Sequence, residues 1–516
     1  MIISGGGNGW LTAYDREGNR LGDFIGHEGD VWAVAPSPDG RYLLSGSADQ
    51  TVRLWNLKTR ELLVTLFHGT DGEWVMWTPQ GYYVGSPKGA ELVGWQINKG
   101  ADKEADYIAA AQLRKTLRRP DIVASAIQLA SAEAAAAKAL GANRSIQDIL
   151  ARSLPKLELV SPKLGATMRG GDAKLTVSLS PTDDPVKLIR MSVNGVQLPD
   201  RQPEQGGGFA PGRIELAAPL AQGENVITAI AVNTEGYESE PLRVRLTHEG
   251  EGSLDKRGTL YVVAIGIDAY PAIPGYFCKD LNGKPKTTCN LDFAGKDATA
   301  FHDTMLKGLG PLHEKVEARL LVNRPGKMAP TAEAIRNVFG LLRRAKPNDT
   351  VAVFLSGHGY NQGRDYLLLP TDAEWSKDLE GFLGARAVLW TEIQTAIQNA
   401  QGRRMLFMDT CHAGNSHAGG LDEAAYYANI IAYYSARWDQ LAVEAGKYGH
   451  GAFTQAVIEG VGGRANGDGD RQITTTELSS YLALRVPQLA AEFGREQNPQ
   501  FFQARDAQVY PLARVN

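Results

Sequence analysis

The chain has 516 residues, which corresponds to about three domains at roughly 100–200 residues per domain. Its 43% hydrophobic and 22% charged residues are ordinary for a globular protein, and a net charge of -4 excludes a nucleic-acid binder that works by bulk charge. Neither a signal-peptide pattern nor a membrane-spanning apolar run is visible. We therefore expect a cytoplasmic protein that binds neither nucleic acid nor membranes.

Residues 1–98 contain a repeat whose clearest unit begins at Gly26-His27 and ends at Trp55-Asn56. This unit resembles a WD-repeat blade, with Trp-Asn where Trp-Asp is usual. Residues 1–24 and 73–96 resemble parts of neighbouring blades, which gives two to three blades, whereas a closed propeller needs about four. Two interpretations stay open: a short β-module that packs on the rest of the chain, or a partial propeller that a partner protein completes.

Residues 101–153 are predicted to form a helical connector, because alanine-rich segments favour helix and Pro120 suits a first helical position. Residues 155–248 return to strand patterns. Apolar and polar residues alternate in Lys174–Ser180 and Asn225–Val232, and turn signals separate such runs. This spacing predicts a β-sandwich similar to immunoglobulin-like spacer domains, and a polar glycine-rich linker follows it.

Residues 257–516 alternate between predicted strands and helices, which is typical of an α/β domain with a largely parallel sheet. The strands are expected near 259–267, 317–322, 350–355 and 404–408, and the helices near 294–308, 331–345 and 391–400. Two apolar strands end in short polar tips that carry His358 and Cys411. Chemistry in open α/β sheets occurs at the carboxyl ends of the strands, so these tips are the candidate active site.

The two tips read Ser356-Gly-His358-Gly359 and Asp409-Thr-Cys411-His-Ala-Gly414. In caspases the histidine lies about 50 residues before the nucleophilic cysteine, as it does here. From roughly residue 257 onward the chain resembles caspase-like cysteine peptidases of the metacaspase and bacterial caspase-like (orthocaspase) branch. The resemblance implies that Cys411 attacks a peptide bond of a protein substrate, that His358 is the base, and that the backbone N–H groups of Gly359 and Cys411 form the oxyanion hole.

A cysteine–histidine pair suits this chemistry, because a thiol at its ordinary pKa is mostly protonated at neutral pH and an imidazole can take its proton. The alternative is a structural thiol beside a core histidine, in a catalytically silent scaffold with a degenerate peptidase domain. His412 and His417 lie near the nucleophile in sequence, and we assign them no catalytic role. No cofactor is required for this chemistry.

The resemblance also implies that Asp409, Ser356 and Asp297 line the first specificity pocket. Two carboxylates in one cleft repel each other unless a cation lies between them, so we expect cleavage after arginine or lysine. A helix-start position for Asp297 and a non-basic specificity remain the alternatives.

Cys278 and Cys289 lie in a polar loop and could form a disulfide or half of a metal site. Three cysteines are too few for a disulfide scaffold, and we expect two free thiols in a reducing cytoplasm.

A calcium loop is a further candidate, with oxygen side chains at its first, third, fifth and twelfth positions: Asn466, Asp468, Asp470 and Glu477. The first residue is not Asp, and Arg471 stands where the turn favours glycine. Thr474 to Glu477 also form a capping box, so a turn followed by a helix start is the favoured interpretation, with calcium as a possible activator.

Residues 415–450 are expected to form a long loop in which Lys447 is the candidate for self-cleavage. An intracellular peptidase must be restrained, so we expect a regulatory protein partner that acts through the WD-repeat module or the β-sandwich.

Overall fold

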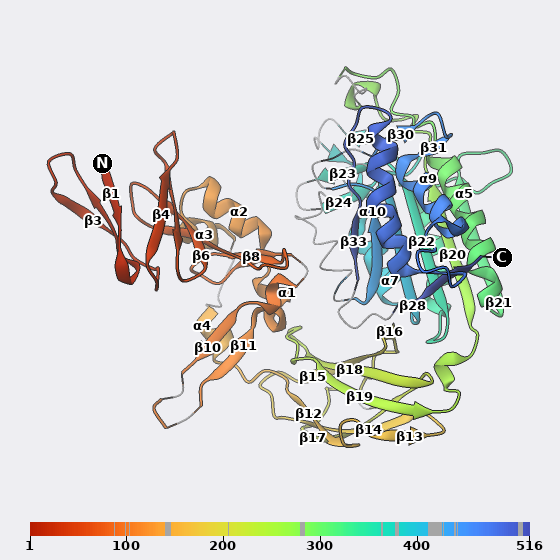
Figure 1. The fold of residues 1–516 in the computed structure, drawn as a ribbon, viewed down its shortest axis with the longest axis horizontal. Coiled ribbons are helices and arrows are strands. Elements are labelled where there is room, and N and C mark those ends of the chain that lie inside the picture. The colour runs from red at the N-terminus through yellow and green to blue at the C-terminus, as the bar shows by residue number, and fades with distance from the viewer. Residues whose placement is uncertain are drawn as a thin grey trace.

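A computed structural model gives three regions: an amino-terminal β-rich region with helices, a region of two β-sheets, and a carboxyl-terminal α/β region (Figure 1). It describes residues 1–86, 88–98, 100–102, 104–139, 146–204, 206–278, 284–362, 365–376, 381–410, 426, 428–437, 440, 442–503 and 509–515. Across these ranges, no helix is both long and apolar enough to cross a membrane.

The amino-terminal region contains two antiparallel sheets. The first has three strands, β1 (Ile2–Gly5), β2 (Leu11–Tyr14) and β3 (Arg20–Phe24). The second has six strands in chain order: β4 (Val31–Pro36), β5 (Tyr42–Ser47), β6 (Thr51–Asn56), β7 (Leu62–His68), β8 (Trp74–Trp77) and β9 (Tyr83–Gly85). The strands that follow the clearest repeat thus extend its sheet.

The helical connector begins differently from the prediction. Strand β11 (Asp106–Ala109) lies inside the segment expected to be helical, because it pairs antiparallel with β10 (Gly94–Ile97). The helices that follow are α1 (Arg114–Leu117), α2 (Pro120–Gln128), α3 (Ala132–Ala139) and α4 (Ile146–Leu150). Pro120 occupies the start of α2, as predicted, and Ala130 has a φ of 52°, which ends the helical path before α3.

The middle region packs two sheets against each other around a shared apolar core. One sheet has the order β12 (Leu157–Ser161), β14 (Ala173–Leu179) and β17 (Gly212–Ala218). The other has the order β13 (Thr167–Arg169), β19 (Leu242–Glu249), β18 (Gly223–Asn233), β15 (Val186–Val193) and β16 (Val196–Gln197). Every second residue of β14 is buried, as expected for a strand with one face toward a core.

The carboxyl-terminal region is built on a six-stranded sheet. Its order is β21 (Lys315–Val322), β20 (Thr259–Gly266), β22 (Thr350–Gly357), β28 (Arg403–Thr410), β29 (Ile430–Tyr434) and β33 (Gln500–Phe502). The first five strands are parallel, and β33 runs antiparallel to β29. The prediction of one long loop at 415–450 was wrong, because β29 lies within it and extends the sheet.

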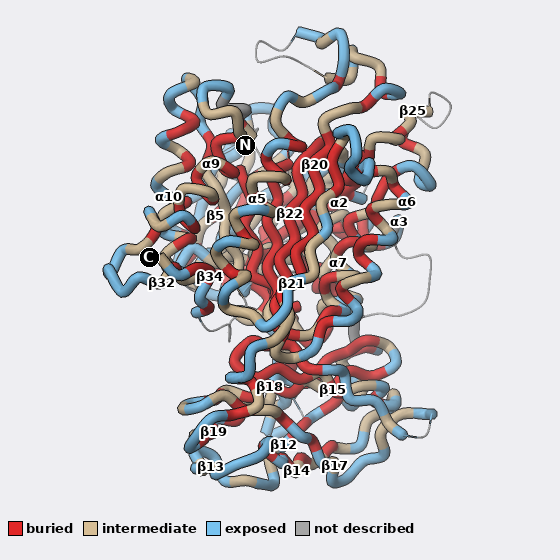
Figure 2. The backbone as a smooth tube through the Cα atoms, turned by 90° about the vertical axis from the view of Figure 1, so that its right-hand side faces the viewer, coloured by how far each residue is buried: buried red, intermediate tan, exposed pale blue. Residues whose placement is uncertain are grey.

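Alternate side chains of the central strands face two helical layers. Val262, Phe354 and Phe407 belong to the core shared with α5 (Ala294–Gly308), α9 (Ala452–Glu459) and α10 (Thr475–Ala491). The residues between them belong to the core shared with α6 (Ala332–Phe339) and α7 (Trp390–Gln398). Strands β20 and β22 are therefore buried along their length (Figure 2). The helix expected at 331–345 ends at Phe339, and a 3-10 turn continues from Gly340 to Arg344.

Arg404 ties the start of β28 to its surroundings. Its buried guanidinium donates hydrogen bonds to the carbonyls of Ile397, Gln398 and Ala400 at the end of α7, and to the carbonyl of Ala428. Helix ends leave such carbonyls without partners inside the helix, so this cation caps α7. Burial, and to a lesser extent the nearby charge of Arg190, lowers the pKa of Arg404 to about 9.

Arg404→Met should lower the free energy of unfolding of the α/β region by about 2–4 kcal/mol, because it removes the hydrogen bonds that the buried guanidinium donates to carbonyls at the end of α7. Arg343→Met is the matched control, because Arg343 is exposed and its replacement should change stability by less than about 0.5 kcal/mol. Urea denaturation followed by tryptophan fluorescence measures both. Equal midpoints for the two variants would contradict this role of Arg404.

Candidate active site

The two predicted strand tips lie side by side. Strand β22 pairs in parallel with β28 so that Ser356 is the register partner of Asp409, and Gly357 is the partner of Thr410. His358 follows directly after Gly357. The candidate nucleophile Cys411 and the neighbouring His412 and His417 lie outside the described residues.

Tyr270 and Cys289 hold His358 through three contacts. Its backbone N–H donates to the hydroxyl of Tyr270 at 2.7 Å, and the two rings lie 4.7 Å apart between centroids. Its Nε2 lies 2.7 Å from the backbone carbonyl oxygen of Cys289. A carbonyl only accepts hydrogen bonds, so Nε2 carries the proton. In the neutral ring Nδ1 is therefore unprotonated. Burial lowers the pKa of His358, partly opposed by the hydrogen bond to Cys289.

At position 359, the oxyanion-hole candidate, glycine is required because the Tyr366 side chain lies very close to the backbone. A Cβ atom at this position would lie 2.0 Å from the hydroxyl of Tyr366, so only glycine fits. That hydroxyl is 2.7 Å from the Thr410 hydroxyl, so it links the tips of β22 and β28. The backbone at the tip is therefore fixed by contacts on both strands.

The two pocket candidates Asp297 and Asp409 come together although they are far apart in sequence. Both are buried, and both point toward Gly451, where a Cβ atom would lie 3.1 Å from Asp409 Oδ2 and 3.3 Å from Asp297 Oδ2. Ser356 is also buried, next to Asp409 in the sheet register. The structure thus joins the first turn of α5 to the ends of β22 and β28.

Two residues beside these carboxylates were not predicted. His450 places Nδ1 2.8 Å from Asp297 Oδ1, and the hydroxyl of Thr454 donates to Asp409 Oδ2 at 2.7 Å. The N–H of Gly451 at the start of α9 also donates to Asp297. A carboxylate at a helix start is favourable, so the alternative structural role of Asp297 gains support as well. No local sequence signal marks contacts across such long separations.

The expectation of two free thiols in the 274–290 loop was wrong. Cys278 and Cys289 form a disulfide with 5.3 Å between their Cα atoms. The loop folds back on itself, because Lys286 N–H donates to the Cys278 carbonyl at 2.8 Å, which brings the two cysteines together. Two cysteines in one loop indicated that a disulfide could form. Free thiols were predicted instead, because a reducing cytoplasm was assumed.

The calcium-loop candidate forms a turn and a helix cap. The side chain of Glu477 accepts hydrogen bonds from the N–H groups of Thr474 and Gly467, and Asp468 and Asp470 accept from the backbone of the same turn. Arg471 adopts a φ of 66° at the position that favours glycine. Within the described ranges, no three His, Cys, Asp or Glu side chains are grouped to hold a metal ion. Activation by calcium through Asn466 to Glu477 stays a prediction.

The self-cleavage candidate Lys447 is exposed in the turn between β30 (Glu444–Ala445) and β31 (His450–Gly451). Its Nζ lies 3.0 Å from Glu492 Oε2. Exposed ion pairs of this kind contribute little to stability, so this pair does not prevent the turn from entering an active site. The same turn leads directly into His450 and the pocket carboxylates.

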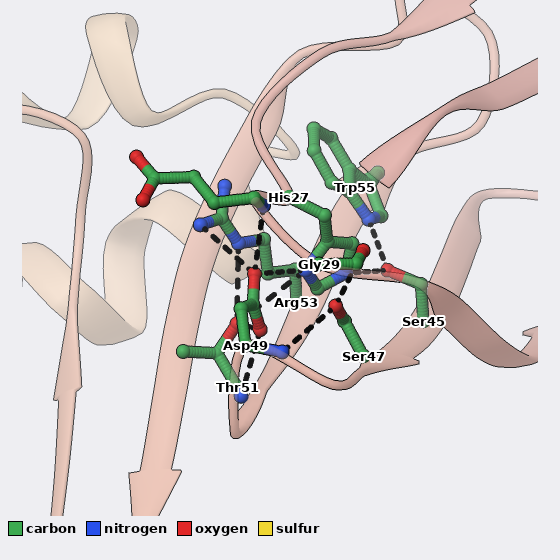
Figure 3. A network of polar contacts seen from close by, with 9 residues as sticks. His27, Gly29, Ser45, Ser47, Asp49, Thr51, Arg53 and Trp55 are labelled. Carbon is green, nitrogen blue, oxygen red and sulfur yellow. Dashed lines mark hydrogen bonds and ion pairs between the residues drawn. The ribbon is translucent and has the colours of Figure 1, made fainter. Parts of the chain in front are cut away.

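A second polar network lies in the amino-terminal region (Figure 3). His27 bridges Asp49 Oδ2 at 2.7 Å and the hydroxyl of Ser45 at 2.8 Å, and Trp55 Nε1 donates to the same hydroxyl at 2.8 Å. Burial alone would raise the pKa of Asp49, but hydrogen bonds from Thr51 and His27 hold it well below its usual range. This chain of contacts fastens the loop before β4 to β5 and β6.

Residues 18–56, which include this network, match the family model "WD domain, G-beta repeat". The chain is 44% identical over 72 residues to eukaryotic translation initiation factor 3 subunit I of Aspergillus oryzae, covering 14% of this chain and 21% of the relative. The subunit of Aspergillus niger is 50% identical over 54 residues, or 10% and 15% of the two chains. The chain spans about a fifth of the length of these curated relatives.

Solved structures add little. The fibronectin(III)-like modules of Clostridium thermocellum CbhA align with 18% of this chain and 99% of their own, at 22% identity and a TM-score of 0.15. An engineered protein aligns with 19% of this chain and 20% of its own, at 15% identity and a TM-score of 0.15. Scores this low carry no argument about the fold, and the WD repeat is what the comparisons establish.

His27→Leu should destabilise the repeat by about 1–3 kcal/mol, because it removes the hydrogen bonds that the buried imidazole makes to Asp49 and Ser45. Hydrogen exchange over residues 42–56 should accelerate in this variant. His68→Leu, at an exposed position of the same sheet, is the control and should leave the exchange rates unchanged. Equal exchange in both variants would show that the network does not hold the repeat.

Proposed function

We propose that the chain is a caspase-like cysteine endopeptidase that cleaves protein substrates after arginine or lysine, with Cys411 as the nucleophile and His358 as the base. The observation that supports this most is the parallel register of β22 and β28, which pairs Gly357 with Thr410. Cys411 follows Thr410 directly, and consecutive Cα atoms are about 3.8 Å apart. The residues that directly precede His358 and Cys411 are therefore partners on neighbouring strands.

The state of His358 suits a base. Its Nε2 proton is engaged by the Cys289 carbonyl, so Nδ1 is the nitrogen that can take the thiol proton. The lowered pKa keeps the ring neutral, and thus able to accept a proton, at neutral pH. The thiolate then attacks the peptide carbonyl, and the protonated imidazole supplies a proton to the leaving amine. Backbone N–H groups of Gly359 and Cys411 would stabilise the oxyanion.

Specificity for basic residues is supported by the convergence of two buried carboxylates on Gly451. A pair of carboxylates this close favours a cation or strong donors between them. In the free protein His450, Gly451 and Thr454 supply donors. A substrate guanidinium, with its planar set of N–H donors, would compete for the same oxygens.

Regulation through the amino-terminal region is supported by a direct contact. The hydroxyl of Tyr426, in the segment that follows the nucleophile, donates to Glu91 Oε1 at 3.0 Å. WD repeats generally mediate protein–protein contacts, and Trp32 on strand β4 is 77% exposed. A protein that binds the WD repeat could shift Glu91 and so move Tyr426, which follows Cys411 in the chain.

Peptides that end in arginine or lysine should be hydrolysed, and peptides that end in aspartate should not. Asp297→Asn and Asp409→Asn should each lower kcat/KM for arginine peptides about 100-fold, because a buried charge contact of about 2–3 kcal/mol is lost. Asp303→Asn, at an exposed position of the same helix α5, is the matched control. A fluorogenic peptide assay with and without calcium measures this, with Cys411→Ala as the inactive reference.

Hydrolysis of aspartate peptides alone would overturn the pocket assignment. No hydrolysis of any peptide, with the protein folded and Cys411 reduced, would favour the silent scaffold.

Self-cleavage should occur after Lys447, because this exposed turn is basic and close to the pocket. Intact-mass spectrometry should show two fragments for the wild type, none for Cys411→Ala and none for Lys447→Gln. Arg437→Gln is the control and should still be cut. A wild-type chain that stays intact while it hydrolyses peptides would rule the site out.

A further inference from the structure

We propose that the Cys278–Cys289 disulfide positions His358, and that its reduction by a dithiol releases this base and lowers peptidase activity. The inference rests on the proposed function, because the disulfide acts only through the base. The disulfide lies directly against the imidazole.

Both halves of the disulfide contact the same ring nitrogen. Cys278 Sγ lies 3.8 Å from His358 Nε2, and the carbonyl oxygen of Cys289 lies 2.7 Å from it. Cys289 is fully buried, whereas the loop around it is largely polar. Tyr270 packs against the His358 ring at 4.7 Å between centroids. The disulfide and Tyr270 together set the orientation of the imidazole.

Apart from the disulfide, the described residues of this loop are held by non-covalent contacts, which include the hydrogen bond from Tyr270 N–H to Asn290 Oδ1 and the packing of Phe277 on Trp375. These residues are also joined by the Pro274–Thr288 bridge and by the hydrogen bond from Lys286 N–H to the Cys278 carbonyl. A covalent crosslink over a short loop restricts the conformations available to both ends. Without it, the Cys289 carbonyl is held near Nε2 by non-covalent contacts alone.

The redox step is a thiol–disulfide exchange. A reduced dithiol attacks the Cys278–Cys289 bond, passes through a mixed disulfide and leaves as its own disulfide, while two electrons and two protons produce the two cysteine thiols. The loop then loses its crosslink, and the imidazole gains rotational freedom and water. An imidazole that spends less time in the productive orientation lowers kcat more than it changes substrate binding.

The same change alters the titration of His358. Burial lowers its pKa, the hydrogen bond to the Cys289 carbonyl raises it, and the nearby charge of Lys286 lowers it. Among the described residues, the titratable side chain of Tyr270 also packs against the ring. Because burial is the largest of these effects, a loosened loop should let the pKa rise toward its ordinary value. The acid limb of the activity profile should then move to higher pH.

The first test uses the full chain with both loop cysteines replaced, Cys278→Ser with Cys289→Ser, so that Cys411 remains the only thiol. Its kcat should fall about tenfold against the oxidised wild type, with KM changed less than about twofold and the acid limb shifted upward. Adding dithiothreitol should reproduce these changes in the wild type and leave the double variant unaffected. Unchanged kcat and an unchanged pH profile in the double variant would overturn the inference.

A second readout separates the inference from the proposed function. In the full-length Cys411→Ala chain, the His358 imidazole resonance is assigned by comparison with His358→Gln and titrated with and without dithiothreitol. A higher pKa after reduction supports the positioning role, even if no form of the protein hydrolyses peptides, in which case only the proposed function fails. An equal pKa in both states would overturn the inference, whether or not the wild type is a peptidase.

Discussion

The parallel pairing of β22 with β28 is the constraint on which the rest of the α/β region depends. Its register sets Ser356 beside Asp409 and Gly357 beside Thr410, and a shift by one residue would turn every side chain of a strand to the opposite face. The alternate residues of these strands fill two separate helical cores, so the register is fixed from both sides. Burial of apolar residues therefore determines where the polar tips of the strands meet.

The candidate site is assembled from elements that are distant in sequence. His358 directly follows β22, Asp297 lies in the first turn of α5, and the start of α9 supplies the donors that hold Asp297 and Asp409. Such a site responds to movements of any of these elements. The loop of Cys278 and Cys289 contacts His358, and Tyr426, which follows Cys411 in the chain, contacts Glu91 of the amino-terminal region.

The sequence predicted the parts of this fold that depend on local patterns. The helix expected at 294–308 is α5, and all four expected strands are present, because continuous apolar runs between polar tips are a strong local signal. Strand β29 was not predicted, because it has only five residues and lies within a long segment whose sequence pattern is typical of a loop. The pairing of β10 with β11 was missed for a similar reason, since a four-residue strand carries little pattern.

Short sequence motifs predicted some residues of the candidate site, whereas residues that reach it only through tertiary contacts were not predicted. Asp297 and Asp409 were named in advance, whereas His450 and Thr454 are brought to them by packing of α9 against α5. The disulfide was visible as a pair of cysteines, but its position against His358 follows from the folding of a loop that has no regular pattern.

Covalent labelling of Cys411 tests most directly the central claim that His358 activates this cysteine. The full chain is treated with an arginyl chloromethyl ketone and the modified residue is identified by mass spectrometry. We expect stoichiometric alkylation of Cys411 in the wild type and labelling at least about tenfold slower in His358→Gln, because the thiolate is then no longer favoured. Equal labelling rates in the two proteins, or labelling of neither, would contradict the account.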